Sequence, residues 1–436
     1  LGAGEDAWRA VTDGSIESGR PYRYFHRDGS GRSLALFFYD GAVARSIAFE
    51  GALASSQAFV QRFRGAVRGE RLLVHTATDG ESYGHHTKFG DRTLAHALEN
   101  EVERHGLATT NYGAFLERHP PEWEVQLKPG PNGEGTAWSC AHGVGRWYWD
   151  CGCHTGGQAG WNQAWRTPLR EALDHLRDFG VTVFSEQGGE LFHDPWAARD
   201  AYVALVLDRS RDKAAFLAPL VRKPLGRDEQ ERALTLLEMQ RQAMLMYTSC
   251  GWFFNDLSGI ETVQVLKYAG RLMDDLMELG ITPPRPSFLE ILSRAHSNVA
   301  ELGSGGDLFR QVVERTRITP RGVAAHLAIS SLVDGEGEAA ETAGYRVRLE
   351  DYRREQRDRL ILATCRIQLE SSATGHQHDY ALAAMHFGGV DFYCVLRPFP
   401  GVPRLRSAAR RVWADFASAS LPVILRTVAK EFGPDE

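Results

Sequence analysis

The stretch "LLVHTATDGESYGHHTKFGD", residues 72–91, changes from apolar to polar within a few residues. Its first part, together with Arg71, predicts a buried β-strand over residues 71–78. Asp79 and Glu81 follow directly, and catalytic groups of parallel α/β sheets lie where strands end. An extended backbone places both carboxylates on one face, and neighbouring carboxylates disfavour each other's ionisation, which suits general acid chemistry. The alternative is a polar loop whose carboxylates cap the next helix, and the spacing alone leaves both open.

Strand and helix patterns alternate on both sides of this stretch. Residues 32–40 form a short apolar and aromatic run that predicts a buried strand. Residues 43–67 have apolar side chains at helical spacing, and residues 92–106 have a helical pattern that ends at a glycine. Strands that alternate with helices indicate an α/β fold with a mainly parallel sheet or barrel.

The pattern becomes helical from about residue 167. Several amphipathic segments follow one another, and the first opens with Thr and Pro and ends at Gly180. We therefore predict a helical bundle over residues 167–333. A polar, glycine-rich hinge then leads to strands of a small β element and a last helix over residues 404–432. The expected domains are 1–166, 167–333 and 334–436.

Composition narrows the classes of protein. The 436 residues carry a net charge of -6 with both signs spread along the chain, so no basic patch indicates nucleic acid. No run of eighteen apolar residues predicts a membrane span. Six cysteines do not make a disulfide scaffold and suggest a reducing compartment, so we expect a cytoplasmic protein.

The opening stretch resembles a signature region of glycoside hydrolase family 57. There a pattern Asp-x-Glu-x-(Phe/Tyr)-Gly-His follows a barrel strand, and its counterparts here are Asp79, Glu81, Tyr83, Gly84 and His85. The segment "FFYDGAVARSIAFEG", residues 37–51, is similar to the one that precedes this region. The later segments "WSCAHGVGRW", "DCGCHTGGQAGWNQAWRTPLREAL" and "MYTSCGWFFNDLSGIETVQVLKYAG" are similar to a C-terminal extension in one branch of the family, a domain of unknown function.

This resemblance implies an incomplete (β/α)7 barrel followed by a helical domain. It also implies a retaining amylase, glucanotransferase, branching enzyme or α-galactosidase, and an α-glucan or malto-oligosaccharide substrate. Retention needs two carboxyl groups about 5–5.5 Å apart. By the motif, Asp79 is the general acid/base, and Glu81 tunes Asp79 or binds a sugar hydroxyl. His85 and His86 bind sugar hydroxyls or hold the loop.

The sequence departs from the family pattern before this region. The family's nucleophile is a glutamate on an earlier strand, whereas only 78 residues precede Asp79 here. We therefore expect the second half of the barrel, with the nucleophile on N-terminal sequence that this chain lacks. That sequence would belong to a longer polypeptide or a partner chain, unless catalysis is lost. Glu50 is a poor substitute because its pattern places it in a helix.

Five of the ten tryptophans lie between residues 138 and 165. Aromatic rings stack on the apolar faces of sugars, so Trp138, Trp161 and Trp165 are candidates for a glucan platform. Asn162, Gln163 and Arg166 are candidates for its polar edge. The alternative is that the rings seal the joint between barrel and bundle.

An interrupted helix further along the chain carries Trp252 and Asp256. In relatives with a helical domain, a helix end with a tryptophan closes over the acceptor sugar, so both are candidates for substrate binding. The alternative is that the aromatic residues at this helix end pack together in the core.

The tryptophan-rich segment also contains three cysteines and two histidines, namely Cys140, His142, Cys151, Cys153 and His154. These residue types bind zinc, but the spacings Cys-x-His and Cys-x-Cys-His are not standard zinc patterns. Two ligands so close in sequence share an ion only where the loop turns sharply. We therefore favour free thiols, assign no metal or cofactor, and keep His142 as a candidate for substrate contact. A non-catalytic α-glucan-binding or regulatory protein, or a metalloprotein, remains an alternative function.

Overall fold

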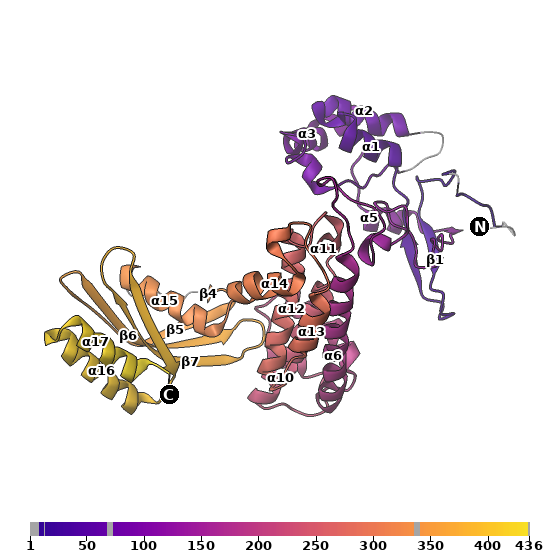
Figure 1. The fold of residues 1–436 in the computed structure, drawn as a ribbon. Helices are drawn as coiled ribbons and strands as arrows, with labels where there is room; N and C mark the ends of the chain where they lie inside the picture. Colours follow the sequence, from indigo (N-terminus) through magenta and orange to yellow (C-terminus); the bar gives the residue numbers. More distant parts are fainter. Residues whose placement is uncertain (1–7, 13, 68–72, 335–340, 435–436) are drawn as a thin grey trace. The chain divides into compact units, whose positions relative to one another are not determined.

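The computed structural model describes residues 8–12, 14–67, 73–334 and 341–434. The chain divides into two compact units, Leu1–Pro129 and Gly130–Glu436, called here the N-terminal and the C-terminal unit (Figure 1). The fold class is mixed α and β. Within the described residues, no helix combines the length and apolar character that a membrane crossing requires.

A small sheet of three strands anchors the N-terminal unit, in the order β2–β1–β3. Strand β1 (Tyr22–Phe25) pairs antiparallel with β2 (Ser33–Leu36) and parallel with β3 (Trp123–Glu124). A strand is thus present in the first half of the stretch predicted at residues 32–40, but it is largely exposed, so the prediction that it is buried is wrong. One parallel pair does not establish a barrel, so the incomplete (β/α)7 barrel stays a proposal.

The helix predicted over residues 43–67 is two helices. Asp40 caps α1 (Gly41–Phe49) by accepting from the backbone N–H groups of Ala42 and Val43, and Ser55 caps α2 (Ser56–Ala66). Between them Gly51 has a φ of 70°, which favours glycine and ends the first helix before the 3-10 turn η1 (Ala52–Ala54).

The helix predicted over residues 92–106 is confirmed. It consists of α3 (Gly90–His96), the π turn η3 (Ala97–Glu101) and α4 (Val102–Arg104). Gly106 follows with a φ of 71°, the left-handed conformation expected of a helix-ending glycine. A further helix, α5 (Tyr112–Arg118), precedes β3.

The strand predicted over residues 71–78 is wrong for the part that the structure describes. Residues 73–78 pair with no strand among the described residues, and Arg71 and Leu72 lie outside them. The backbone N–H of Asp40 donates to the carbonyl of His75 at 2.9 Å. Leu73 and His75 are buried, and the His75 ring lies between the Tyr112 hydroxyl and the Ser18 carbonyl. The apolar stretch that suggested a strand is therefore partly buried without pairing into a sheet.

Long helices form the first part of the C-terminal unit (Figure 1). They are α6 (Arg166–Leu191), α10 (Arg227–Leu245), α12 (Ile260–Glu278) and α13 (Arg285–Leu292). Shorter helices join them, namely α7 (Pro195–Ala201), α8 (Val203–Leu207), α9 (Lys213–Leu217), α11 (Cys250–Phe253) and α14 (Gly305–Leu308). These helices share one apolar core.

Helix α6 corrects one prediction, because it does not end at Gly180. A Cβ atom at Gly180 would lie 3.8 Å from the Leu272 side chain of α12. The glycine therefore sits inside a helix at a helix–helix contact, where packing outweighs its weak helix propensity.

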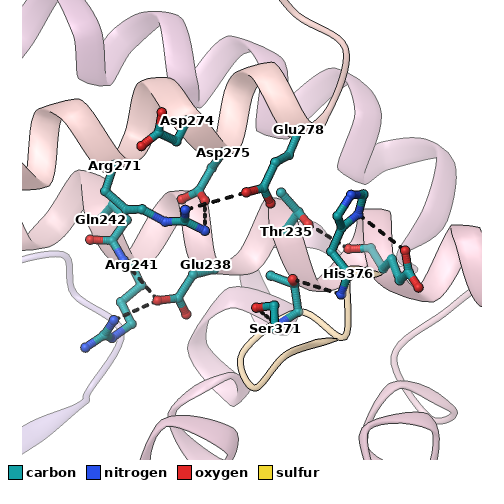
Figure 2. A network of polar contacts seen from close by, with 12 residues as sticks. Thr235, Glu238, Arg241, Gln242, Arg271, Asp274, Asp275, Glu278, Ser371 and His376 are labelled. Atoms are coloured by element: carbon teal, nitrogen blue, oxygen red, sulfur yellow. Dashed lines mark hydrogen bonds and ion pairs between the residues drawn. The ribbon is translucent and has the colours of Figure 1, made fainter. Parts of the chain in front are cut away.

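Buried charged groups on α10 and α12 face one another. Figure 2 shows Glu238, which accepts hydrogen bonds from Gln242 at 2.9 Å and Arg241 at 2.7 Å. On α12, Arg271 pairs with the fully buried Asp275 at 2.8 Å, and burial raises the pKa of that carboxyl. Each of these contacts lies within one helix, so it partners a charge that the packing of α10 against α12 buries.

An antiparallel sheet with helices on both faces forms the rest of the C-terminal unit (Figure 1). Its order is β4 (Glu341–Thr342), β5 (Tyr345–Arg357), β6 (Leu360–Ser371), β7 (Gln377–His386) and β8 (Phe392–Pro398). Helix α15 (Pro320–Asp334) shares a core with one face, and α16 (Val402–Ser418) and α17 (Leu421–Phe432) share a core with the other. The predicted strands are confirmed, whereas the last helix is two helices. The three-domain division stays a prediction.

The contact at Gly251 gives a test of this packing. A Cβ atom there would lie 2.5 Å from Cγ2 of Val265, whose branched side chain has little rotamer freedom. We expect Gly251→Ala to lower the free energy of unfolding by about 1–3 kcal/mol, measured by urea denaturation.

Gly189→Ala is the matched control, because nothing lies within 4 Å of its added Cβ on α6. It should raise the free energy of unfolding by about 0.5–1 kcal/mol. Equal effects of the two substitutions would contradict the packing at Gly251.

Candidate functional site

The candidate residues divide between the two units. The N-terminal unit holds Asp79, Glu81, His85 and His86, and the C-terminal unit holds Trp138, His142, Trp161, Trp165, Trp252 and Asp256. Each group is described within its own unit.

Asp79 begins the 3-10 turn η2 (Gly80–Tyr83), and the side chains of Asp79 and Glu81 are both exposed. Neither carboxylate caps a helix, since η2 and α3 both lack a side-chain capping bond. The capping alternative is therefore wrong. Within the described residues, neither carboxylate forms a hydrogen bond or an ion pair, so both are available to a ligand.

Contacts with Tyr83 and Gly90 hold the loop that carries these carboxylates. The Tyr83 hydroxyl lies 2.9 Å from the Thr78 hydroxyl, and the Tyr83 ring packs on the apolar core of the unit. Gly90 is pressed against this turn, because a Cβ there would lie 3.1 Å from the Tyr83 Cα. Gly84 has a φ of 153°, which few other residues adopt. Tyr83 and Gly84 of the motif thus position the loop.

His85 and His86 are both exposed, and their ring centroids are 5.0 Å apart. Their backbone N–H groups both donate to the Glu81 carbonyl, at 3.0 and 2.8 Å. The main chain therefore holds the loop, and the two rings remain accessible.

Glu50 follows the last residue of α1, and its carboxylate lies 3.1 Å from Nε of Arg45. The prediction that it lies inside a helix is wrong by one position, because α1 ends at Phe49. The described residues do not identify a second carboxyl group for the Asp79 site.

The tryptophans of the C-terminal unit differ widely in exposure. Trp165 is 2% exposed and Trp252 is 1% exposed, and both lie in the bundle core, which leaves no ring face for a sugar. Trp161 is partly exposed, with Gly157 against its ring. Trp138 is 80% exposed. The two exposed rings are the better candidates for ligand contact.

Trp138 belongs to an aromatic patch that also contains Phe253 and Phe254. The Trp138 and Phe253 ring centroids are 6.4 Å apart, and those of Phe253 and Phe254 are 5.3 Å apart. The Arg146 guanidinium lies 4.3 Å from the centre of the Phe253 ring. The sequence suggested Trp252 at this helix end, but Trp252 is buried, Phe253 is half-buried and Phe254 is exposed.

A pocket of about 340 Å³ is formed by residues that follow Trp138 in the sequence. It is lined by Asp150, Gly152, His154, Gly156, Gly157, Gln158, Ala159, Trp161, Asn162 and Gln163. Asn162 is bound to Asn298 through two hydrogen bonds of 3.0 and 2.9 Å. Asn298, which the sequence did not single out, therefore fixes one wall of the pocket.

Asp256 is a buried hydrogen-bond acceptor that joins the segment after α11 to residues 297 and 298. It is 7% exposed and accepts hydrogen bonds from the Ser258 backbone and hydroxyl, the Ser297 hydroxyl and the Asn298 backbone. These bonds occupy both carboxylate oxygens. The geometry gives Asp256 a positioning role.

Three thiols and one imidazole converge in the same segment. The ligand atoms of Cys140, His142, Cys151 and Cys153 all lie within 4.8 Å of one another. Burial raises the pKa of the Cys140 thiol, but hydrogen bonds from the backbone of Arg146 and His142 and from the thiols of Cys153 and Cys151 together lower that pKa to about 7. Burial raises the pKa of the Cys151 thiol.

Beneath these side chains lies the guanidinium of Arg166, at 0% exposure. It donates to the Cys153 carbonyl at 3.1 Å and to the Phe254 carbonyl at 3.5 Å. Burial lowers its pKa. Arg166 therefore does not form the polar edge of a sugar site that the sequence suggested for it.

Two family models match the chain. Residues 161–436, more than half of it, match the family described as a domain of unknown function, DUF3536. The chain belongs to this family. Residues 5–128 match glycosyl hydrolase family 57, so the chain has the two-part organisation of the branch that carries this C-terminal domain. No curated protein and no solved structure matches it.

Asp256 offers a test of how the region is assembled. We expect Asp256→Ala to lower the free energy of unfolding by about 2–4 kcal/mol, because several donors lose a charged acceptor. Glu186→Ala, at an exposed position of α6, should change it by less than about 0.5 kcal/mol. Unfolding by heat or urea measures both, and an unchanged Asp256→Ala protein would remove Asp256 from this role.

Proposed function

We propose that this family 57 protein is a retaining carbohydrate-active enzyme that acts on α-glucans, with Asp79 as its general acid/base. One observation carries the proposal. The family 57 match includes Asp79, whose exposed carboxylate projects from a loop that Tyr83 and Gly84 hold on the core. A carbohydrate substrate follows from the family, whereas the α-glucan specificity and a cytoplasmic location are part of the proposal.

In this mechanism Asp79 donates a proton to the glycosidic oxygen as the bond to the anomeric carbon breaks. A second carboxylate, about 5–5.5 Å away, attacks that carbon and forms a covalent glycosyl–enzyme. Asp79 then removes a proton from water or from a sugar hydroxyl, which displaces the second carboxylate. Glu81, His85 and His86 follow Asp79 within seven residues of the sequence and would bind hydroxyl groups of the sugar.

The C-terminal unit supports the proposal through a second surface. The rings of Trp138 and Phe254 are exposed, on either side of the half-buried Phe253, and would stack on the C–H faces of glucose units. Trp161 and Asn162 line a pocket with amide groups suited to sugar hydroxyls. We assign glucan binding to this surface.

A non-catalytic α-glucan-binding protein is the second candidate. It is favoured by the aromatic patch, because the described residues offer this surface but do not identify a second carboxylate for Asp79. Binding by the aromatic patch needs no such partner.

The first test replaces Asp79. We expect Asp79→Asn to lower turnover of a malto-oligosaccharide roughly 100- to 10,000-fold, the usual contribution of general acid–base catalysis. Retention by glycogen in a native gel should not change. Asp91→Asn, exposed near the same loop, is the matched control and should keep the unaltered turnover.

Equal turnover of the Asp79→Asn and Asp91→Asn proteins would exclude Asp79 from the mechanism. A chain that binds glycogen but never turns over would favour the second candidate.

The second test concerns the aromatic patch. Loss of one stacking ring costs about 0.5–1.5 kcal/mol, so Trp138→Ala should weaken glycogen binding roughly 2- to 10-fold. Trp138→Phe should restore most of it, and Leu207→Ala, an exposed apolar residue elsewhere at 82% exposure, should have no effect. Unchanged binding by Trp138→Ala would place the glucan on another surface.

A further inference from the structure

Four side chains in the irregular segment of residues 130–165 meet at one point. Cys140 Sγ lies 3.8 Å from Cys151 Sγ and 3.8 Å from Cys153 Sγ, and Cys153 Sγ lies 3.5 Å from Nδ1 of His142. One sulfur is thus close to two others, so these cysteines do not sort into a disulfide pair.

These separations match those of a tetrahedral zinc site. Zinc bonds to sulfur are about 2.3 Å long and bonds to imidazole nitrogen about 2.0–2.1 Å. At tetrahedral angles, two sulfur ligands then lie about 3.8 Å apart, and sulfur and nitrogen about 3.5 Å apart. We propose that Cys140, His142, Cys151 and Cys153 bind one zinc ion as a structural site.

The backbone explains how such short spacings converge. Gly143 has a φ of 69° and Gly152 a φ of 79°, so the chain turns sharply directly after His142 and between Cys151 and Cys153. The N–H of His142 donates to the Cys140 sulfur, and that of Cys153 donates to the Cys151 sulfur. Such bonds from the residue two positions later orient a sulfur toward a shared ion.

Charge balance is a second, independent observation. Arg166 is fully buried, and no carboxylate within the described residues forms an ion pair with it, although a buried cation needs a compensating charge. The sulfur of Cys151 favours its charged form more than the carboxylate of Asp150 does. Its Nη1 lies 3.9 Å from the Cys151 sulfur. Three thiolates and one Zn²⁺ carry a net charge of about −1, which Arg166 neutralises.

Ligand type and number decide the metal and its role. Thiolate and imidazole ligands in a tetrahedron favour zinc over hard cations. Four protein ligands leave no open position for water, so the ion is structural and takes no part in glycosidic chemistry. His154 is not among the residues whose ligand atoms converge, and its Nδ1 accepts from the Gly156 backbone at 3.1 Å.

The test is the metal content of the full chain, purified with added zinc and measured by mass spectrometry. We expect about one zinc per chain in the unaltered protein and a loss of at least tenfold in Cys153→Ser. His154→Gln and Cys250→Ser are the matched controls, a histidine and an exposed cysteine outside the cluster, and both should keep the zinc.

If Cys153→Ser does not fold, two measurements on the unaltered protein still test whether the four residues bind zinc. Titration with a mercurial reagent should release the zinc as three thiols react, and cobalt substitution should give the absorption of tetrahedral thiolate coordination. A zinc-free folded protein, zinc retained by Cys153→Ser, or iron with acid-labile sulfide would each overturn the proposal.

Discussion

The convergence of three thiols and one imidazole is the constraint on which the start of the C-terminal unit depends. Residues 130–165 include nine glycines and one short 3-10 turn, η4 (Gly145–Trp147), so main-chain hydrogen bonds alone hold little of the segment. Long loops without regular structure are uncommon in compact domains. Here Cys140 and Cys153, thirteen residues apart, are brought together above Arg166 at the start of α6.

The aromatic patch and the pocket, which we assign to glucan binding, both lie next to these cysteines in the sequence, so their positions depend on the same convergence. Trp138 stands two residues before Cys140, and the pocket begins at Asp150, next to Cys151. Arg166 connects the cluster to the Phe254 carbonyl, and Phe254 belongs to the aromatic patch. A metal at the cluster would therefore fix the patch and the pocket wall together. In the N-terminal unit the equivalent role falls to Tyr83 and Gly84, which hold the Asp79 loop by packing and backbone conformation.

Local chemistry made much of this fold predictable from the sequence. The glycine stop at Gly106 and the helical patterns of the bundle both appear in the structure. The prediction failed where tertiary contact overrides local preference. Gly180 stays in a helix because α12 packs against it, and residues 73–78 are buried without pairing into a strand.

The candidate site was predictable only in part. The motif around Asp79 can be recognised from its spacing, whereas the direction in which a side chain points cannot. Trp252 is buried in the core whereas Phe254, just after the same short helix, is exposed. The thiol cluster was visible in composition, but its nonstandard spacing hid the geometry, which depends on left-handed glycines at positions 143 and 152.

X-ray absorption at the zinc edge of the purified full chain is the most direct measurement of the central claim. The proposed site gives three sulfur ligands at about 2.3 Å and one nitrogen ligand at about 2.0–2.1 Å. A coordination shell made of oxygen and nitrogen alone would contradict it, because the zinc would then be bound elsewhere and the segment of residues 130–165 would be held by some other means.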